Sequence, residues 1–226
     1  MSRTIAIGDM HGCATALQTL LDRMQPTSDD TIVGLGDYVD RGMESARTID
    51  ILIELVTHTR LIPLIGNHEL MMYQGLFHGQ DDFKFWFQHG GNATLASYGG
   101  KPEQIPPPHI SFLSQCIRFF ETDTHFFVHA NYEPGLPLAE QPDEILFWRH
   151  IRPVAPPPHA NGKIAVVGHT PQPDGDILNL GHLICLDTYC YGDQWMSALD
   201  VDSGQFWQAN NRGQIREGQL QAPATN

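Results

Sequence analysis

Positive charge is the scarcest property of this sequence, which has 13 lysines and arginines against 26 aspartates and glutamates in 226 residues. The net charge of -13 argues against a non-specific nucleic-acid binder, because a phosphate backbone is bound by a basic surface. We therefore expect no nucleic-acid partner. Any phosphate group would have to be bound by a local positive site, made of metal ions and a few arginines.

Cysteines and long apolar runs are also scarce. The four cysteines form no CxxC pair and no dense framework, which favours reduced thiols in a cytosolic setting. No apolar run approaches the roughly 20 residues that span a bilayer, so no membrane partner is expected. The first residues run directly into a strand-like segment instead of a signal peptide, and we expect a cytoplasmic protein.

The first third of the chain alternates between strand-like and helix-like segments. Residues 3–8, 31–37 and 60–67 read as short buried strands, and residues 12–24 and 43–58 have helical spacing. This alternation favours parallel α/β packing.

The rest of the chain divides into two parts. Residues 68–120 look helical, and strand-like runs return from about residue 118. The polar residues 211–226 are expected to form a flexible C-terminal tail.

Potential metal ligands follow five of the strand-like runs. They are Asp9 and His11, Asp37, Asn67, His129, and His169. In α/β sheets, sites form beyond the carboxyl ends of the strands, and carboxylate, imidazole and amide oxygen ligands suit Mn, Fe or Zn. Taken singly, each position is better explained as a turn, a helix cap or a core histidine. Their common place after a strand, five times in order, argues against coincidence.

The motifs around these residues are GDMHG, GDYVDRG, GNHE, VHA and GHT, in that order. The series resembles the PPP-type phosphoprotein phosphatases of the calcineurin-like metallophosphoesterases, over about residues 3–200. Cys13 and the run GGNATLASYG resemble the small bacterial and phage-type members. The resemblance implies an α/β fold in which a β-sandwich of two mixed sheets is flanked by helices, with residues 1–210 as a single catalytic domain.

The resemblance also implies a dinuclear metal centre. Mn²⁺ is the first choice for its two ions, and Fe and Zn are alternatives. The ligand roles implied by the family pattern are Asp9 and His11 for the first metal, Asp37 as the bridge, and Asn67, His129 and His169 for the second metal.

The same pattern assigns an acid and a phosphate-binding group. His68 would be the general acid for the leaving alkoxide, oriented by Asp40, and Arg41 would hold the phosphate oxygens. A second phosphate-binding arginine is expected downstream. Arg149 is the first choice and Arg152 the second.

The leading functional hypothesis is a serine/threonine protein phosphatase, with possible dual specificity, in which a hydroxide bridging the metals attacks a phosphomonoester. A symmetrical dinucleoside tetraphosphate hydrolase and a small-molecule phosphatase are alternatives with the same chemistry. A non-catalytic metal-binding scaffold is the alternative from another class. The expected partner is a phosphoprotein, a phosphopeptide or a small phosphate ester, and the chain is expected to be a monomer.

Departures from the family pattern fall in the loops around the predicted site. Asn131 follows VHA where the family often has Gly, and Tyr189 stands where the family has the Gly of its DTG block. These changes leave the predicted metal ligands intact, and they put the substrate preference in doubt.

Overall fold

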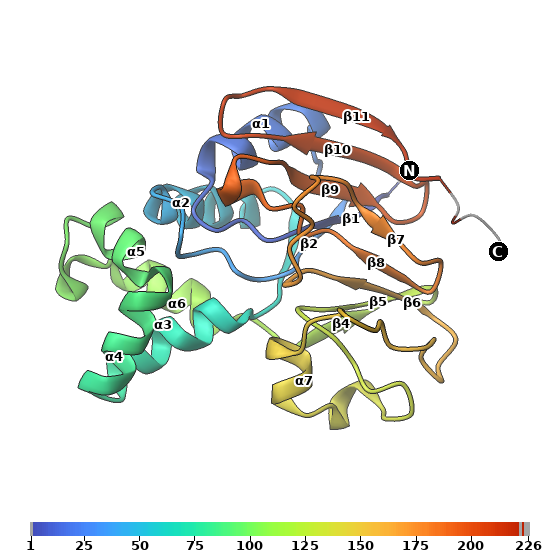
Figure 1. The fold of residues 1–226 in the computed structure, drawn as a ribbon. Coiled ribbons are helices and arrows are strands. Elements are labelled where there is room, and N and C mark those ends of the chain that lie inside the picture. Colours follow the sequence, from blue (N-terminus) through green and yellow to red (C-terminus); the bar gives the residue numbers. More distant parts are fainter. Residues whose placement is uncertain (1, 222, 224–226) are drawn as a thin grey trace.

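The computed structural model describes residues 2–221 and 223. Two mixed β-sheets face each other, and helices lie outside them (Figure 1). The first sheet consists of β1 (Thr4–Ile7), β2 (Thr31–Gly34), β3 (Arg60–Pro63), β9 (Met196–Asp200), β10 (Gln205–Ala209) and β11 (Ile215–Gln219). Its strand order is β11-β10-β9-β1-β2-β3, in which β1, β2 and β3 are parallel and the other pairs antiparallel.

The second sheet has the order β4-β5-β6-β8-β7. Its strands are β4 (Phe119–Glu121), β5 (His125–Val128), β6 (Ile164–Val167), β7 (Leu178–Asn179) and β8 (Leu183–Cys185). The central strands β5, β6 and β8 are parallel, and β4 and β7 pair antiparallel at the two edges. The carboxyl ends of the parallel strands therefore share one edge within each sheet.

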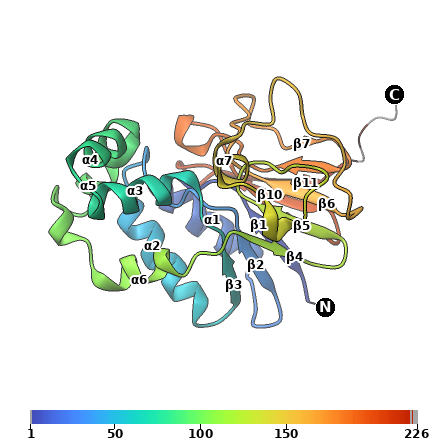
Figure 2. The same cartoon turned by 90° about the horizontal axis from the view of Figure 1, so that it is seen from below.

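The helices form three groups: α1 (Ala14–Met24) and α2 (Ser45–Val56); α3 (Asn67–Phe77), α4 (Gln80–Trp86), a π-helical turn η1 (Phe87–Gly91), α5 (Asn92–Ser97) and α6 (Pro107–Ser114); and α7 (Asp143–Trp148). Short 3₁₀ turns are η2 (Pro102–Gln104), η3 (Leu138–Glu140) and η4 (Cys190–Gly192). The group from α3 to α6 gathers beyond one end of the sheets in both views (Figures 1 and 2).

Alternation along the strands separates three apolar cores. Ile5 and Ile7 pack in the core beneath α1 and α2, whereas Ala6 between them faces the core that lies between the sheets. In the second sheet, Phe127 enters the same inter-sheet core, and Phe126 faces the opposite side, where it packs with the residues of α7. The predicted sandwich of two mixed sheets between helices is confirmed.

The prediction of a flexible tail from residue 211 is wrong for β11. This strand pairs with β10 from Gln205↔Gln219 to Ala209↔Ile215. Its side chains alternate only between exposed and half-buried, so backbone hydrogen bonds hold it at the sheet edge. The sequence therefore has no apolar pattern from which this strand could be predicted. Residues 222 and 224–226 of the expected tail lie outside the described residues. The single catalytic domain over residues 1–210 stays a prediction.

No helix within the described part of the chain is long and apolar enough to cross a membrane.

Candidate metal centre and active site

The six predicted metal ligands meet where strands of both sheets end. Asp9 and His11 follow β1, Asp37 follows β2, Asn67 begins α3 after β3, His129 follows β5, and His169 follows β6. The chain needs glycine beside two of them. A Cβ atom on Gly66 would lie 2.2 Å from Oδ1 of Asp37, and one on Gly168 would lie 2.0 Å from Oδ1 of Asp9. The motif glycines thus let neighbouring loops approach the carboxylates closely.

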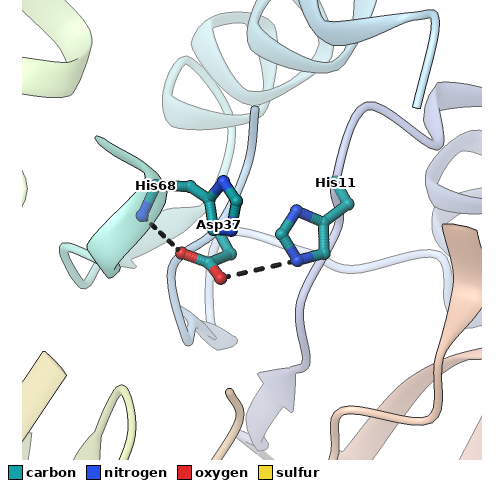
Figure 3. A group of neighbouring side chains, drawn as sticks. All are labelled: His11, Asp37 and His68. Atoms are coloured by element: carbon teal, nitrogen blue, oxygen red, sulfur yellow. Dashed lines mark hydrogen bonds and ion pairs between the residues drawn. The ribbon is translucent and has the colours of Figure 1, made fainter. Parts of the chain in front are cut away.

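Asp37 lies at the centre of this cluster, and only 2% of it is exposed. Its Oδ2 is 3.5 Å from Nε2 of His11, and its Oδ1 is 3.4 Å from Nε2 of His129. Figure 3 shows the carboxylate between His11 and His68, and the backbone N–H of His68 donates to Oδ1 at 3.0 Å. One carboxylate therefore faces two histidine groups with different oxygens, as a ligand between two ions must.

Asn67 joins the remaining histidines. Its Oδ1 is 3.0 Å from Nε2 of His129 and 2.9 Å from Nδ1 of His169. The backbone N–H of His169 donates to both oxygens of Asp9, at 3.1 and 3.0 Å. Residues from the first sheet and residues from the second sheet therefore form one continuous polar cluster.

Each of the three predicted histidine ligands has one ring nitrogen against a backbone carbonyl. Nδ1 of His11 lies 3.0 Å from Val39 O, Nδ1 of His129 lies 2.8 Å from Leu35 O, and Nε2 of His169 lies 3.1 Å from Trp148 O. A carbonyl can only accept, so the facing nitrogen carries the proton and the other nitrogen turns a lone pair toward the cluster. Metal-binding histidines are oriented in this way.

Burial favours the neutral form of the same three rings. It lowers the pKa of His11 well below its ordinary value and lowers the pKa of His129. For His169, burial and then the neighbouring His129 lower the pKa to about 3. Neutral imidazole is the form that binds a metal.

Three carboxylates of the cluster, those of Asp9, Asp37 and Asp187, are buried near one another. Burial, followed by the charges of Asp187 and Asp37, raises the pKa of Asp9 well above its usual range. Burial also raises the pKa of Asp187 to about 7. Among the described residues, Oδ2 of Asp187 is the buried side-chain atom without a hydrogen-bond partner. Buried carboxylates that repel one another, one of them with an oxygen that has no donor in the residues that the structure describes, are stabilised by cations, so this set of ligand atoms fits divalent metal ions.

The pair predicted to supply the acid is present at the same place. Nδ1 of His68 lies 2.8 Å from Oδ2 of Asp40, and both side chains are buried. Burial lowers the pKa of His68, but the charges of Asp37 and Asp40 and the hydrogen bond with Asp40 outweigh it, so the pKa is raised above its ordinary value. His68 is therefore held toward the protonated form, unlike the other three histidines.

Arg41 reaches the cluster from the side of His11. Its Nη1 is 3.4 Å from Nε2 of His11 and donates to the hydroxyl of Tyr191 at 2.5 Å. The Tyr191 ring also contacts His11 edge-on, with 4.7 Å between the ring centroids. Tyr191 therefore fixes the guanidinium beside the proposed first metal, and its place in the loop gave no sign of this in the sequence.

The two candidates for the second arginine have other partners. Nη1 of Arg149 donates to Glu133 at 2.5 Å, and Nη2 of Arg152 donates to Gln172 at 2.5 Å. Arg149 directly follows Trp148, whose carbonyl contacts His169, so its backbone lies beside the cluster while its side chain points to Glu133. The choice between the two arginines stays a prediction.

Glu69 is a site residue that was not singled out in the sequence. Its carboxylate accepts the backbone N–H groups of Asp37 at 2.8 Å, Tyr38 at 2.7 Å and Gly66 at 2.9 Å. It thereby fixes the loop that carries Asp37 to the first turn of α3. Its place three residues after Gly66 is that of a capping box, which is a signal that could have found it.

Comparison with known proteins agrees with this geometry. Residues 2–202 match the calcineurin-like phosphoesterase family. The chain is 27% identical over 211 residues to serine/threonine-protein phosphatase 2 of Salmonella typhimurium. This match covers 90% of this chain and 88% of that protein. It is 38% identical over 69 residues to the symmetrical bis(5'-nucleosyl)-tetraphosphatase of Paraburkholderia phymatum, a match that covers 30% of this chain and 24% of that protein.

Solved structures share the fold. The cold-active protein-tyrosine phosphatase of a psychrophilic Shewanella species superposes with a TM-score of 0.68 at 17% identity, covering 97% of this chain and 80% of that one. A protein serine/threonine phosphatase from Saccharomyces cerevisiae superposes with a TM-score of 0.53 at 14% identity, covering 100% of this chain and 81% of that one. From the family match over residues 2–202, and in agreement with the cluster of carboxylates and histidines, the chain belongs to the calcineurin-like phosphoesterases and is a phosphoester hydrolase.

Proposed function

We propose that this hydrolase is a dinuclear phosphomonoesterase that acts on phosphoserine and phosphothreonine in proteins or peptides. The observation that carries the proposal is the position of Asp37, whose two oxygens face His11 and His129 while the His68–Asp40 pair lies against the same carboxylate. The Salmonella phosphatase, similar over 90% of this chain, supports the choice of substrate.

The residues divide between two ions. Asp9 and His11 would hold one, Asn67, His129 and His169 the other, and Asp37 would bind both. When bound, two divalent ions supply Lewis acidity and make a water molecule acidic enough to act as nucleophile near neutral pH. Mn²⁺ is the first candidate, with Fe and Zn as alternatives, because all three accept mixed oxygen and imidazole ligands.

The side chains around the ions do the remaining work. Arg41 binds the equatorial phosphate oxygens, since its planar group presents parallel N–H donors to two oxygens at once. His68 donates the proton from Nε2 to the departing oxygen, while Nδ1 stays bound to Asp40. A serine or threonine alkoxide is a poor leaving group, so this proton matters most for the proposed substrate. Arg149, or alternatively Arg152, completes the phosphate contacts after leaving its present partner.

A dinucleoside tetraphosphate hydrolase is the second candidate. The 38% identity to the Paraburkholderia tetraphosphatase over 69 residues favours it, and the same ligands would serve. That match covers 24% of the relative, whereas the match to the Salmonella phosphatase covers 88% of its length, so the protein phosphatase stays first.

A substrate panel tests the proposal. With Mn²⁺ present, kcat/KM is expected to be higher for phosphoserine and phosphothreonine peptides than for diadenosine tetraphosphate or small sugar phosphates. Activity on p-nitrophenyl phosphate should disappear with a chelator and return when Mn²⁺ is restored, which controls for irreversible damage. Full activity in metal-free protein would refute the metal mechanism, and a clear preference for the dinucleotide would replace the substrate.

A further inference from the structure

Asp40 and Arg41 are two consecutive residues in a strained backbone conformation. Their φ angles are 72° and 67°, in the left-handed region that L-residues other than glycine rarely adopt. Such a conformation persists only where the surroundings hold it, and it is common at functional sites. The contacts that hold these two residues therefore show what positions the proposed acid pair and the proposed phosphate-binding arginine.

Those contacts come largely from one segment, residues 86–94. The indole N–H of Trp86 donates to both carboxylate oxygens of Asp40, at 3.0 Å each. The hydroxyl of Thr94 donates to Oδ1 of Asp40 at 2.7 Å and accepts the backbone N–H of Asp40 at 2.8 Å. The carbonyl of Gly90 accepts the backbone N–H of Arg41 at 3.2 Å.

Both oxygens of the Asp40 carboxylate accept hydrogen bonds from protein side chains. It is 0% exposed, and it accepts from His68, Trp86 and Thr94. Because the group is cut off from water, no solvent molecule can replace a donor that is removed. Without the indole N–H or the hydroxyl, the carboxylate would rotate toward the donors that remain, and the hydrogen bond that orients His68 would change with it.

The indole itself has no room to move. Trp86 is 0% exposed, and two glycines lie close to its ring. A Cβ atom on Gly91 would come within 2.5 Å of the ring, and one on Gly75 within 3.0 Å. The close approach of Gly75 in α3 and Gly91 in η1 to the ring thus restricts the direction of its N–H.

We propose that Trp86 and Thr94 are positioning residues that hold Asp40 so that His68 points its acidic nitrogen at the leaving oxygen. The inference deepens the proposed function, since it rests on the acid role of His68. It gives the helical segment from α4 to α5 an indirect part in the reaction, through two side chains that would act on Asp40 and would not touch the substrate.

Leaving-group dependence separates this role from general support of the fold. A phosphoserine peptide releases an alkoxide and needs the acid, whereas p-nitrophenyl phosphate releases a stabilised phenolate and needs it little. Loss of one hydrogen bond to a buried charged group predicts that Trp86→Phe lowers kcat on the peptide about tenfold or more and changes kcat on p-nitrophenyl phosphate by about twofold or less. Thr94→Val should do the same, Thr94→Ser should restore the peptide rate, and bound Mn²⁺ should stay at the wild-type amount.

Matched variants away from Asp40 serve as controls. Trp207→Phe alters a buried tryptophan in β10, and Thr48→Val removes a hydroxyl of α2 that donates to the carbonyl of Glu44, the residue before that helix. Both should keep the wild-type ratio of the two rates.

The outcomes distinguish the two proposals. His68→Asn must show the same selective loss on the peptide, and its absence would overturn the acid role and the positioning role together. A selective loss in His68→Asn combined with an equal fall on both substrates in Trp86→Phe and Thr94→Val would overturn the positioning role alone. Trp86 and Thr94 belong to different elements, so either variant carries the test if the other does not fold.

Discussion

Two groups of histidines lie within one cluster and differ in the partner of a single ring nitrogen. His11, His129 and His169 each place that nitrogen against a neutral backbone carbonyl, at 3.0, 2.8 and 3.1 Å. His68 places it against the carboxylate of Asp40, at 2.8 Å. Burial keeps the pKa of the first group below the ordinary value, whereas Asp37 and Asp40 raise the pKa of His68 despite its burial.

In this cluster, the group that faces the outer ring nitrogen of a histidine, a carbonyl or a carboxylate, determines the chemistry to which the ring is suited. A carbonyl fixes the tautomer and leaves the ring neutral, which suits a metal ligand. A carboxylate stabilises the imidazolium, which suits an acid. Residue type is shared by all four rings, and His11, His129 and His68 are each at most 1% exposed, so neither property distinguishes the two roles.

Asp37→Asn should have the largest effect, because Asp37 contacts both groups. An amide in place of the carboxylate removes the charge and one of the two anionic oxygens with which Asp37 would hold the ions. We expect loss of bound metal and a fall in kcat of about 10³-fold or more, given the several kcal/mol that metal stabilisation supplies. Metal analysis and kinetics on p-nitrophenyl phosphate measure both. Asp200→Asn, at the far end of β9, is the control that should keep metal and activity.

His68→Asn should remove the proposed acid and leave the three histidines of the metal cluster in place. The variant is expected to keep both metals and to lose about 10² to 10⁴-fold in kcat on a phosphoserine peptide, the usual range for general acid catalysis. Metal content and the peptide rate are measured on the same sample. An unchanged peptide rate would remove His68 from the mechanism, and loss of metal would place it among the ligands.

The smallest expected effect is on stability, where the two groups should respond to pH in opposite directions in metal-free protein. The folded pKa of His169, about 3, lies below the unfolded value of about 6.5, so its burial costs stability as pH falls below 6.5. His169→Gln should therefore gain about 1–2 kcal/mol relative to wild type between pH 7 and pH 5.

His68 has the opposite sign. Its folded pKa is raised, so its contribution to stability is fully present below about pH 6.5 and is lost as pH rises through the folded pKa. His68→Gln should therefore lose stability relative to wild type as pH falls. Denaturant unfolding of both variants at pH values from 5 to 9 measures the two slopes, that of His169→Gln below about pH 6.5 and that of His68→Gln above it. Slopes of the same sign would contradict the division of the histidines.

The sequence was sufficient to predict that the residues following the strands would lie close together. Asp9, Asp37 and His129 stand at the ends of short apolar runs, and parallel strands bring such positions to one edge, so their meeting could be predicted. The alternation of Ile5, Ala6 and Ile7 is consistent with burial on both faces of the first sheet, although the sandwich itself was implied by the family resemblance.

Residues that act through tertiary contacts could not be predicted in this way. Trp86 and Thr94 reach Asp40 across 46 and 54 positions of chain, and no spacing rule connects them. Asp187 stands in the loop that departs from the family pattern, and its missing hydrogen-bond partner becomes visible only in three dimensions. For the same reason, the sequence could not decide between Arg149 and Arg152, whose side chains are placed by Glu133 and Gln172.

The polar cluster that joins the two sheets also bears on how the protein is made. The proposed ligands extend from Asp9 to His169, and the hydrogen bonds from His169 to Asp9 span 160 positions of chain. During synthesis from the N-terminus, the first three strands can pair long before the second sheet has left the ribosome. The complete ligand set can assemble only after residue 169 has emerged, so catalytic competence requires the second sheet as well as the first.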